Sequence, residues 1–146
     1  MKIDNTISLV SSLREVVNRA FIEEMEKEGM VGLVPSHGSV LSMLFRQEEL
    51  SKGAIADGIR RDKSTVTTLI NKLIKHGYVK TRKNPEDSRS ILVSLTEKGK
   101  ELEAGTWCIS ERIFETLFLD ISDEERESFR TVLMKLISNM QDVYDK

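Results

Sequence analysis

Two groups of side chains in the middle of the chain have the types and spacing to bind a polyanion. The first is a run of hydroxyl and basic residues, namely Lys63, Ser64, Thr65, Thr67, Thr68 and Lys72. The second flanks a turn and consists of Arg82, Lys83, Asp87 and Arg89. Basic groups pair with phosphates, and hydroxyl groups both donate and accept hydrogen bonds. Neither group pairs a nucleophile with a base at a recognisable spacing, so the chemistry is that of binding.

The charge of the chain is strongly segregated around these two groups. Residues 51–100 hold 12 Lys and Arg against 5 Asp and Glu, a net charge of +7. The other residues hold 10 against 19, whereas the whole chain has a net charge of only −2. A basic face on an acidic protein indicates a polyanionic partner that is met on one side.

The hydroxyl run requires a helix to display it. Asp62 is the predicted N-cap, the helix continues to His76, and Gly77 is suited to a left-handed residue after its end. At helical spacing, one face carries Val66, Leu69, Ile70 and Leu73, and the other carries Ser64, Thr65, Thr68 and Lys72. The polar face is therefore free to meet a partner.

The second group requires a hairpin. Residues 78–82 and 90–95 have the composition of two strands, and residues 83–88 between them contain turn-forming Asn, Pro and Asp. The sequence thus predicts a strand, a long charged tip and a second strand.

Further helices surround this region. Residues 6–27 repeat apolar side chains every three or four positions, and Gly29 and Gly32 then break the helix. A helix starting near Ser36, its expected N-cap, buries Val40, Leu41, Leu44 and Phe45. A short helix spans about residues 53–58.

Two more helices complete the chain. Thr96 is the predicted N-cap of one long helix to about residue 117, and Ser122 with Glu125 forms a capping box that opens the last. The last helix stays amphipathic nearly to its end. Its apolar stripe must be covered by the first helix, the preceding long helix or a second copy of the chain.

The order helix, helix, turn, helix, strand, basic tip, strand is that of a winged helix-turn-helix, a mainly α fold with a small β-hairpin wing (α+β). Over residues 36–105 the chain resembles the MarR family of bacterial transcription regulators. The resemblance rests on Ala54-Ile55-Ala56, Asp62-Lys63-Ser64-Thr65-Val66-Thr67, Leu73, Gly77, Asp87-Ser88-Arg89-Ser90 and Leu95-Thr96-Glu97-Lys98-Gly99. The flanking helices match in placement and length, not in residue identity.

Physical reasoning and the resemblance together predict how DNA is contacted. A helix fits the major groove of B-DNA, so Lys63, Ser64, Thr65, Thr67 and Thr68 are assigned there and Lys72 to the backbone. The helix N-terminus itself favours a phosphate. The alternative is that these hydroxyls merely solvate the start of a helix.

The wing has its own predicted contacts. Arg89 matches the residue that enters the minor groove, and Asp87, two residues earlier, would orient it through a bidentate pair, which the resemblance also implies. Arg82 and Lys83 are expected to meet phosphates. A tip charged only for solubility is the alternative.

One position departs from the family pattern. Where the family usually has a glycine and then an apolar residue before the recognition helix, this chain has Arg60-Arg61, and Gly58 lies earlier. The two arginines favour phosphate contact, or are simply solvated, and they leave the geometry of the turn open.

The resemblance implies a homodimer that binds double-stranded DNA at a pseudo-palindromic operator, usually as a repressor relieved by a small aromatic or phenolic molecule or by an oxidant. Residues 1–146 then form a single domain, with a DNA-binding lobe at 36–100 and dimerisation helices at 1–30 and 101–146. The rival interpretation is a winged-helix module that binds an acidic protein, because a basic wing serves that purpose too.

Other functions find little support in the residues. No enzyme signature, cofactor-binding loop or metal-ligand cluster is present, and His37 and His76 are predicted in different helices with no third ligand. The single Cys108 is expected to be buried and inert rather than an oxidation sensor. Trp107 and Met43 fit either a ligand pocket or the core. No apolar run reaches the roughly 20 residues of a membrane span and no signal peptide is evident, so a cytoplasmic protein is expected.

Overall fold

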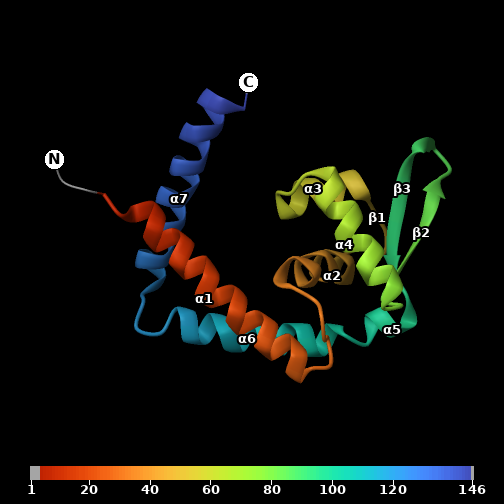
Figure 1. The fold of residues 1–146 in the computed structure, drawn as a ribbon, viewed down its shortest axis with the longest axis horizontal. Helices are drawn as coiled ribbons and strands as arrows, with labels where there is room; N and C mark the ends of the chain where they lie inside the picture. The colour runs from red at the N-terminus through yellow and green to blue at the C-terminus, as the bar shows by residue number, and fades with distance from the viewer. Residues whose placement is uncertain (1–3, 146) are drawn as a thin grey trace. The chain divides into compact units, whose positions relative to one another are not determined.

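The computed structural model describes residues 4–145 and is mainly helical with one small sheet (Figure 1). Its elements are α1 (Thr6–Lys27), α2 (Pro35–Arg46), β1 (Leu50–Ser51), α3 (Lys52–Ile59), α4 (Lys63–Lys75), β2 (Val79–Asn84), β3 (Asp87–Leu95), α5 (Glu97–Lys100), α6 (Glu103–Leu117) and α7 (Asp123–Tyr144). The chain divides into two compact units, one ending at Glu111 and the other starting at Arg112. Among residues 4–145, no helix has both the length and the apolar character of a membrane span.

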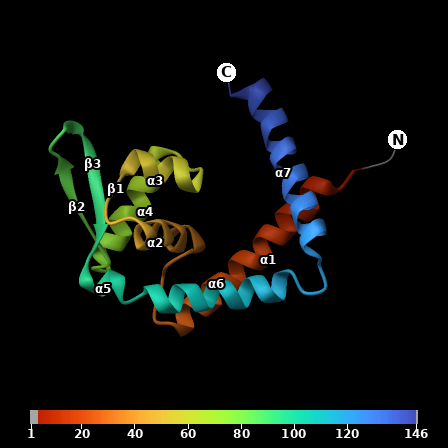
Figure 2. The same ribbon diagram turned by 180° about the vertical axis from the view of Figure 1, so that it is seen from behind.

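The winged lobe is built on a buried apolar core shared by its helices and its sheet. The sheet is antiparallel in the order β1-β3-β2, and Figure 2 shows it beside α2, α3 and α4. The core residues of α4 that the sequence predicted, Val66, Leu69, Ile70 and Leu73, are all buried. They pack with residues that include Val40, Leu41, Leu44, Ile55, Val79 and Val93. This packing fixes which face of α4 remains outside, and the predicted winged fold is confirmed.

The start of α2 differs from the prediction. Val34 is the N-cap, Pro35 is the first helical residue, and the backbone N–H of Val34 donates to Nδ1 of His37 at 2.9 Å. Ser36 was therefore wrong as the N-cap. Proline favours the first helical position because its φ is already helical and its missing N–H has no partner there anyway. The predicted burial of α2 holds for Val40, Leu41 and Leu44, whereas Phe45 is half-buried.

His37 makes folding stability sensitive to acid. Its burial lowers its pKa from 6.5 to about 4, helped by the nearby charge of Lys72. The folded state favours the neutral imidazole. The contribution of His37 to the free energy of unfolding is therefore at its full value above pH 6.5, and it falls by up to about 3 kcal/mol as the pH drops towards 4. Urea denaturation across this range should show that slope. His37→Gln should flatten it, because Gln still accepts at this capping position but does not titrate. His76→Gln is the control, and equal slopes in all three proteins would contradict the assignment.

The hairpin is tighter than predicted. β2 extends to Asn84 and β3 begins at Asp87, so only Pro85 and Glu86 form the turn. The side chain of Asn84 accepts the backbone N–H of Glu86 at 3.0 Å, and the pairing shifts register between Lys83 and Asn84. An Asn side chain mimics a backbone turn in this way, which lets the strands pair closer to the tip. The strand β1 was not predicted, because two residues carry no period.

The long helix predicted after the wing is interrupted. Thr96 is an N-cap as expected and accepts the N–H of Gly99 at 3.1 Å, but α5 ends at Lys100. The chain turns at Glu101 and Leu102 before α6 begins at Glu103. Residues 101–104 contain no helix breaker, although Gly99 and Gly105 lie on either side of them, so the sequence did not indicate where the helix is interrupted.

The last helix begins as predicted. The N–H of Glu125 donates to Oγ of Ser122 at 3.1 Å, and the N–H of Ser122 donates to Oε2 of Glu125 at 2.9 Å. This capping box fixes the start of α7, which has no buried residue within this single chain.

Candidate nucleic-acid interface

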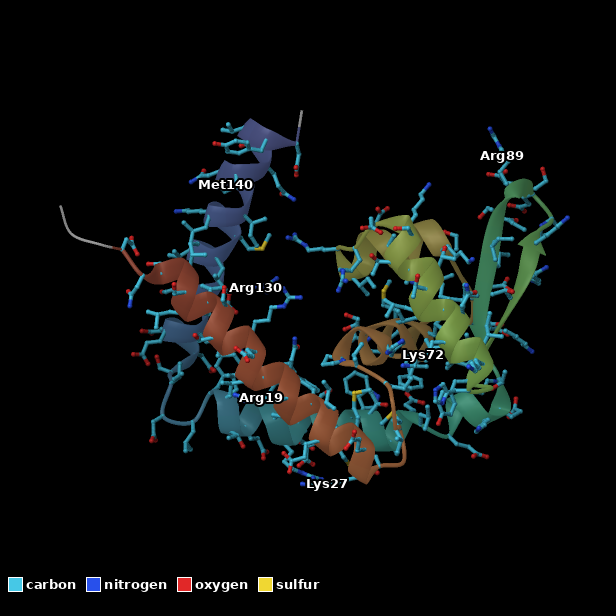
Figure 3. The ribbon with its side chains drawn as sticks, in the orientation of Figure 1. Arg19, Lys27, Lys72, Arg89, Arg130 and Met140 are labelled. Carbon is cyan, nitrogen blue, oxygen red and sulfur yellow. The ribbon has the colours of Figure 1, made fainter. Side chains whose placement is uncertain are left out.

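The polar face of α4 lies on the surface of the winged lobe. Lys63, Ser64, Thr68 and Lys72 are exposed, and Thr65 and Thr67 are half-buried. Figure 3 labels Lys72 on this helix. The hydroxyl of Thr68 donates to the backbone oxygen of Ser64 at 3.1 Å, which leaves its oxygen able to accept from a partner. One exposed face of α4 thus carries ammonium and hydroxyl groups together, and the apolar side chains of the opposite face are buried in the core.

The N-terminus of α4 already holds an anion of its own. Oδ1 of Asp62 accepts the backbone N–H of Thr65 at 2.7 Å and the hydroxyl of Ser64 at 2.8 Å. These hydrogen bonds, that from the Thr65 backbone first, lower the pKa of Asp62 to about 2, so the carboxylate stays charged. The expectation that a phosphate uses this helix end is therefore unsupported. The exposed side chains of Lys63 and Lys72 remain on this helix as cationic groups that can pair with an anion.

The turn before α4 is now defined. Arg60 has φ +56° and ψ +46°, the left-handed conformation that favours glycine. The N–H of Arg61 donates to the backbone oxygen of Ala56 at 3.1 Å, and its guanidinium donates to Oγ of Ser36 at 3.1 Å. The arginine at position 60 thus takes a backbone conformation that suits the family's usual glycine, and Arg61 ties the turn to α2. The turn before α4 therefore forms without a glycine at this position.

Arg60→Gly should stabilise the folded protein. A left-handed non-glycine residue costs about 1–2 kcal/mol. Removing that strain outweighs the added conformational freedom that glycine gives the unfolded chain, for a net gain of about 0.5–1 kcal/mol. Thermal unfolding of the variant would show a higher Tm. Arg60→Ala is the matched control, because it removes the same charge but keeps the strain. A gain of stability in both variants would point to charge repulsion instead.

Arg89 projects from the tip of the wing (Figure 3). Its side chain is 93% exposed, and its Nε lies 3.7 Å from Oδ1 of Asp87. The same carboxylate oxygen accepts the backbone N–H of Arg89 at 3.0 Å. The predicted pair exists, but the bidentate geometry was wrong, because Asp87 binds the backbone of Arg89 more closely than its guanidinium. The guanidinium is therefore open to a partner.

The other two wing cations are not equivalent. Successive residues of a strand point to opposite faces, and Arg82 and Lys83 are neighbours on β2. Lys83 is exposed, whereas Arg82 donates from Nε and Nη2 to the two carboxylate oxygens of Glu49, both at 2.8 Å. The hydrogen bond from Arg82 lowers the pKa of Glu49, and Glu49 raises that of Arg82. No sequence pattern indicated Glu49, because it lies 33 residues away.

Three other residues that the sequence singled out are Cys108, Trp107 and Met43. Cys108 is exposed, so the expectation of a buried thiol was wrong. Trp107 is 44% exposed, with the guanidinium of Arg46 5.5 Å from its ring centroid, and is therefore not a core residue. Met43 is half-buried against Gly58, where an added Cβ would collide with its side chain. Among residues 4–145, no group of three or more His, Cys, Asp or Glu side chains is arranged to hold a metal ion.

Comparison with known proteins places this lobe among transcription regulators. The profile of the MarR family matches residues 33–91. The HTH-type transcriptional regulator SarZ of Staphylococcus haemolyticus is 31% identical over 100 residues, which are 68% of this chain and 67% of that protein. An uncharacterized HTH-type transcriptional regulator of Bacillus subtilis, YdgJ, is 28% identical over 116 residues, 80% of this chain and 71% of that protein.

Solved structures agree. A MarR transcriptional regulator from Methanosarcina mazei has a TM-score of 0.74 and 27% identity, over 93% of this chain and 96% of that one. The MepR protein of Staphylococcus aureus, in a complex with DNA, has a TM-score of 0.82 over 94% of this chain and 99% of that one. Its identity of 21% means that this second likeness concerns the fold alone.

Proposed function

Because the chain belongs to the MarR family, we propose that it is a transcription regulator that binds double-stranded DNA sequence-specifically as a homodimer. The observation that carries the proposal is that one lobe exposes two cationic surfaces together. One is the face of α4 with its ammonium and hydroxyl groups, and the other is the tip of the wing with the guanidinium of Arg89. The polar face of α4 is held outward by its buried Val66, Ile70 and Leu73, and Arg89 extends from the wing tip. A helix suits the major groove, and an extended guanidinium suits a narrow minor groove.

The proposed dimer is supported by apolar side chains of α1 and α7 that are exposed in a single chain. Ile7, Leu9, Leu13 and Val16 of α1 are exposed. On α7 the exposed apolar residues are Phe129, Val132, Met134, Leu136, Ile137, Met140, Val143 and Tyr144. A second copy of the chain would bury such stripes and would pair two winged lobes with two half-sites. This proposal keeps the DNA-binding lobe at residues 36–100 and the dimerisation helices at 1–30 and 101–146, of which residues 1–3 and 146 lie outside the described part.

The regulation follows the usual logic of the family. The protein would lie in the cytoplasm and would repress transcription. A small aromatic or phenolic molecule would relieve that repression. Such a molecule acts only if it binds the DNA-incompetent arrangement of the lobes more tightly than the competent one. The proposal includes no catalytic activity.

Fluorescence anisotropy with DNA tests the proposal directly. Duplex from the region upstream of the gene is compared with a shuffled duplex at two salt concentrations. Tight binding to the first alone, with two protomers per duplex and a steep salt dependence, is the expected result. Equal and weak binding to both, repeated with other genomic fragments, would favour the rival, a winged-helix module with an acidic protein partner.

Arg89→Ala should weaken specific binding by about 1–3 kcal/mol, which is roughly 5-fold to 150-fold in Kd, and should reduce the preference for A·T-rich flanks. The reason is that the variant loses the guanidinium that enters the minor groove. Competition assays with operators that differ only in their flanks measure both effects. Lys100→Ala, which removes an exposed cation from α5, is the control for net charge. Unchanged affinity in Arg89→Ala would remove Arg89 from the interface.

A further inference from the structure

One ion pair ties the wing to the segment that precedes β1. The guanidinium of Arg82 and the carboxylate of Glu49 form two parallel hydrogen bonds, both of 2.8 Å. Most surface ion pairs contribute little to stability, but bidentate arginine–carboxylate pairs are the exception because their geometry is defined. The Glu49 side chain is 28% exposed and that of Arg82 is 58% exposed. The pair is therefore ordered enough to act as a brace.

The position of the pair in the sheet is informative. Arg82 lies opposite Leu92 of β3, and Leu92 lies opposite Ser51 of β1. This is the last row in which β3 has a partner on both sides, because β1 contains only Leu50 and Ser51. From Lys83 to Ile91 the wing is an isolated two-stranded hairpin, and such hairpins are marginal on their own. The ion pair thus spans the sheet where the projecting hairpin would bend.

We propose that Glu49 is a positioning residue for DNA recognition. By holding Arg82 at the base of the hairpin, Glu49 sets the direction in which the hairpin projects and so the place where Arg89 meets the minor groove. Arg82 is then a structural residue and not a phosphate contact. This inference rests on the proposed function, since it concerns the same interface.

Four variants separate bracing from phosphate binding. Glu49→Gln removes the carboxylate charge, Arg82→Gln removes the guanidinium, and the exchanged double variant Glu49→Arg/Arg82→Glu restores an ion pair with its polarity reversed. Lys80→Gln is the control, because Lys80 is exposed on the same strand and face and its charge also acts on Glu49. Affinity for the operator, preference for A·T flanks and salt dependence are measured for each.

Bracing predicts that Glu49→Gln and Arg82→Gln each weaken operator binding by about threefold to tenfold and reduce the flank preference. The exchanged variant recovers much of both, and the slope of log affinity against log salt is the same as in the unmodified protein. Lys80→Gln keeps the flank preference. The opposite pattern overturns the inference: tighter binding by Glu49→Gln, a slope lower by about one in Arg82→Gln, and a further loss in the exchanged variant.

A measurement without DNA keeps this test separate from the proposed function. Amide hydrogen exchange in residues 83–91 should become faster in Glu49→Gln and Arg82→Gln and return towards normal in the exchanged variant. Unchanged hydrogen exchange in both single variants contradicts the proposed bracing role of the ion pair, whatever the result of the DNA-binding measurements. Failure of the unmodified protein to prefer its operator over shuffled DNA contradicts the proposed function instead, and the exchange data still report on the brace.

Discussion

Replacing Ile137 and Met140 of α7 together with glutamate should convert the protein to monomers and weaken binding to a two-half-site operator by about 100-fold or more. Both side chains lie on the apolar stripe of α7 and are 40% and 60% exposed in one chain. Burying unpaired carboxylates in a dimer interface costs several kcal/mol per charge. A single lobe also loses the advantage of binding two linked half-sites at once. Sedimentation and anisotropy measure the two effects.

The matched control places the same charges on the opposite face of the same helix. Thr131→Glu with Ser138→Glu adds two carboxylates at exposed polar positions of α7, and it should leave both the dimer and the operator affinity nearly unchanged. Circular dichroism of both double variants should show intact helices, since neither pair is buried in the chain. If Ile137→Glu/Met140→Glu remains a dimer with normal affinity, α7 does not form the interface.

Gly99→Ala should destabilise the winged lobe severely. An added Cβ at this position would collide with the backbone oxygen of Tyr78 and would lie 3.1 Å from a methyl group of Leu95. The obstacle is backbone at the base of the wing, which cannot rotate away, and the N–H of Thr96 donates to the same oxygen. We expect a loss of about 3 kcal/mol or more, the upper end for overpacking, and with it a loss of DNA binding. Urea denaturation measures the first and anisotropy the second.

Gly38→Ala is the comparison for this glycine. Gly38 also lies inside a helix, but its added Cβ would be 3.9 Å from Cε of Met25, an ordinary contact. Alanine in place of glycine favours a helix by up to about 1 kcal/mol, so this variant should be as stable as the unmodified protein or more so. If Gly99→Ala behaves like Gly38→Ala, the approach of Gly99 to Tyr78 is not tight in solution.

The exposure of Cys108 changes how the helical part of the chain should be viewed. The sequence favoured a buried thiol because free cysteine is among the most buried residue types. On α6 the neighbouring Ile109 is buried, whereas Trp107 and Cys108 are exposed. Cys108 therefore does not lie on the buried face of the helix. The type of one residue predicts its burial poorly, because its position on the helix decides which surroundings it has.

The amino-acid sequence by itself determined the features that depend on neighbours within about four residues. The bounds of α1, the caps Asp62, Thr96 and Ser122, the left-handed Gly77 and the buried stripe of α4 were all predicted correctly. Helical hydrogen bonds and caps are local, so residue type and spacing are enough to specify them. The spaced motifs of the lobe were also enough to indicate the family and its winged fold.

Only the tertiary structure decided the features that depend on residues far apart in the chain. These include the pairing of β1 with β3 and the hydrogen bond from Arg61 to Ser36. The largest change concerns Arg82, which the sequence assigned to DNA and the fold pairs with Glu49. Charge and composition identify a cation, but its partner is set by the path of the backbone, which brings residues 33 positions apart into hydrogen-bonding distance.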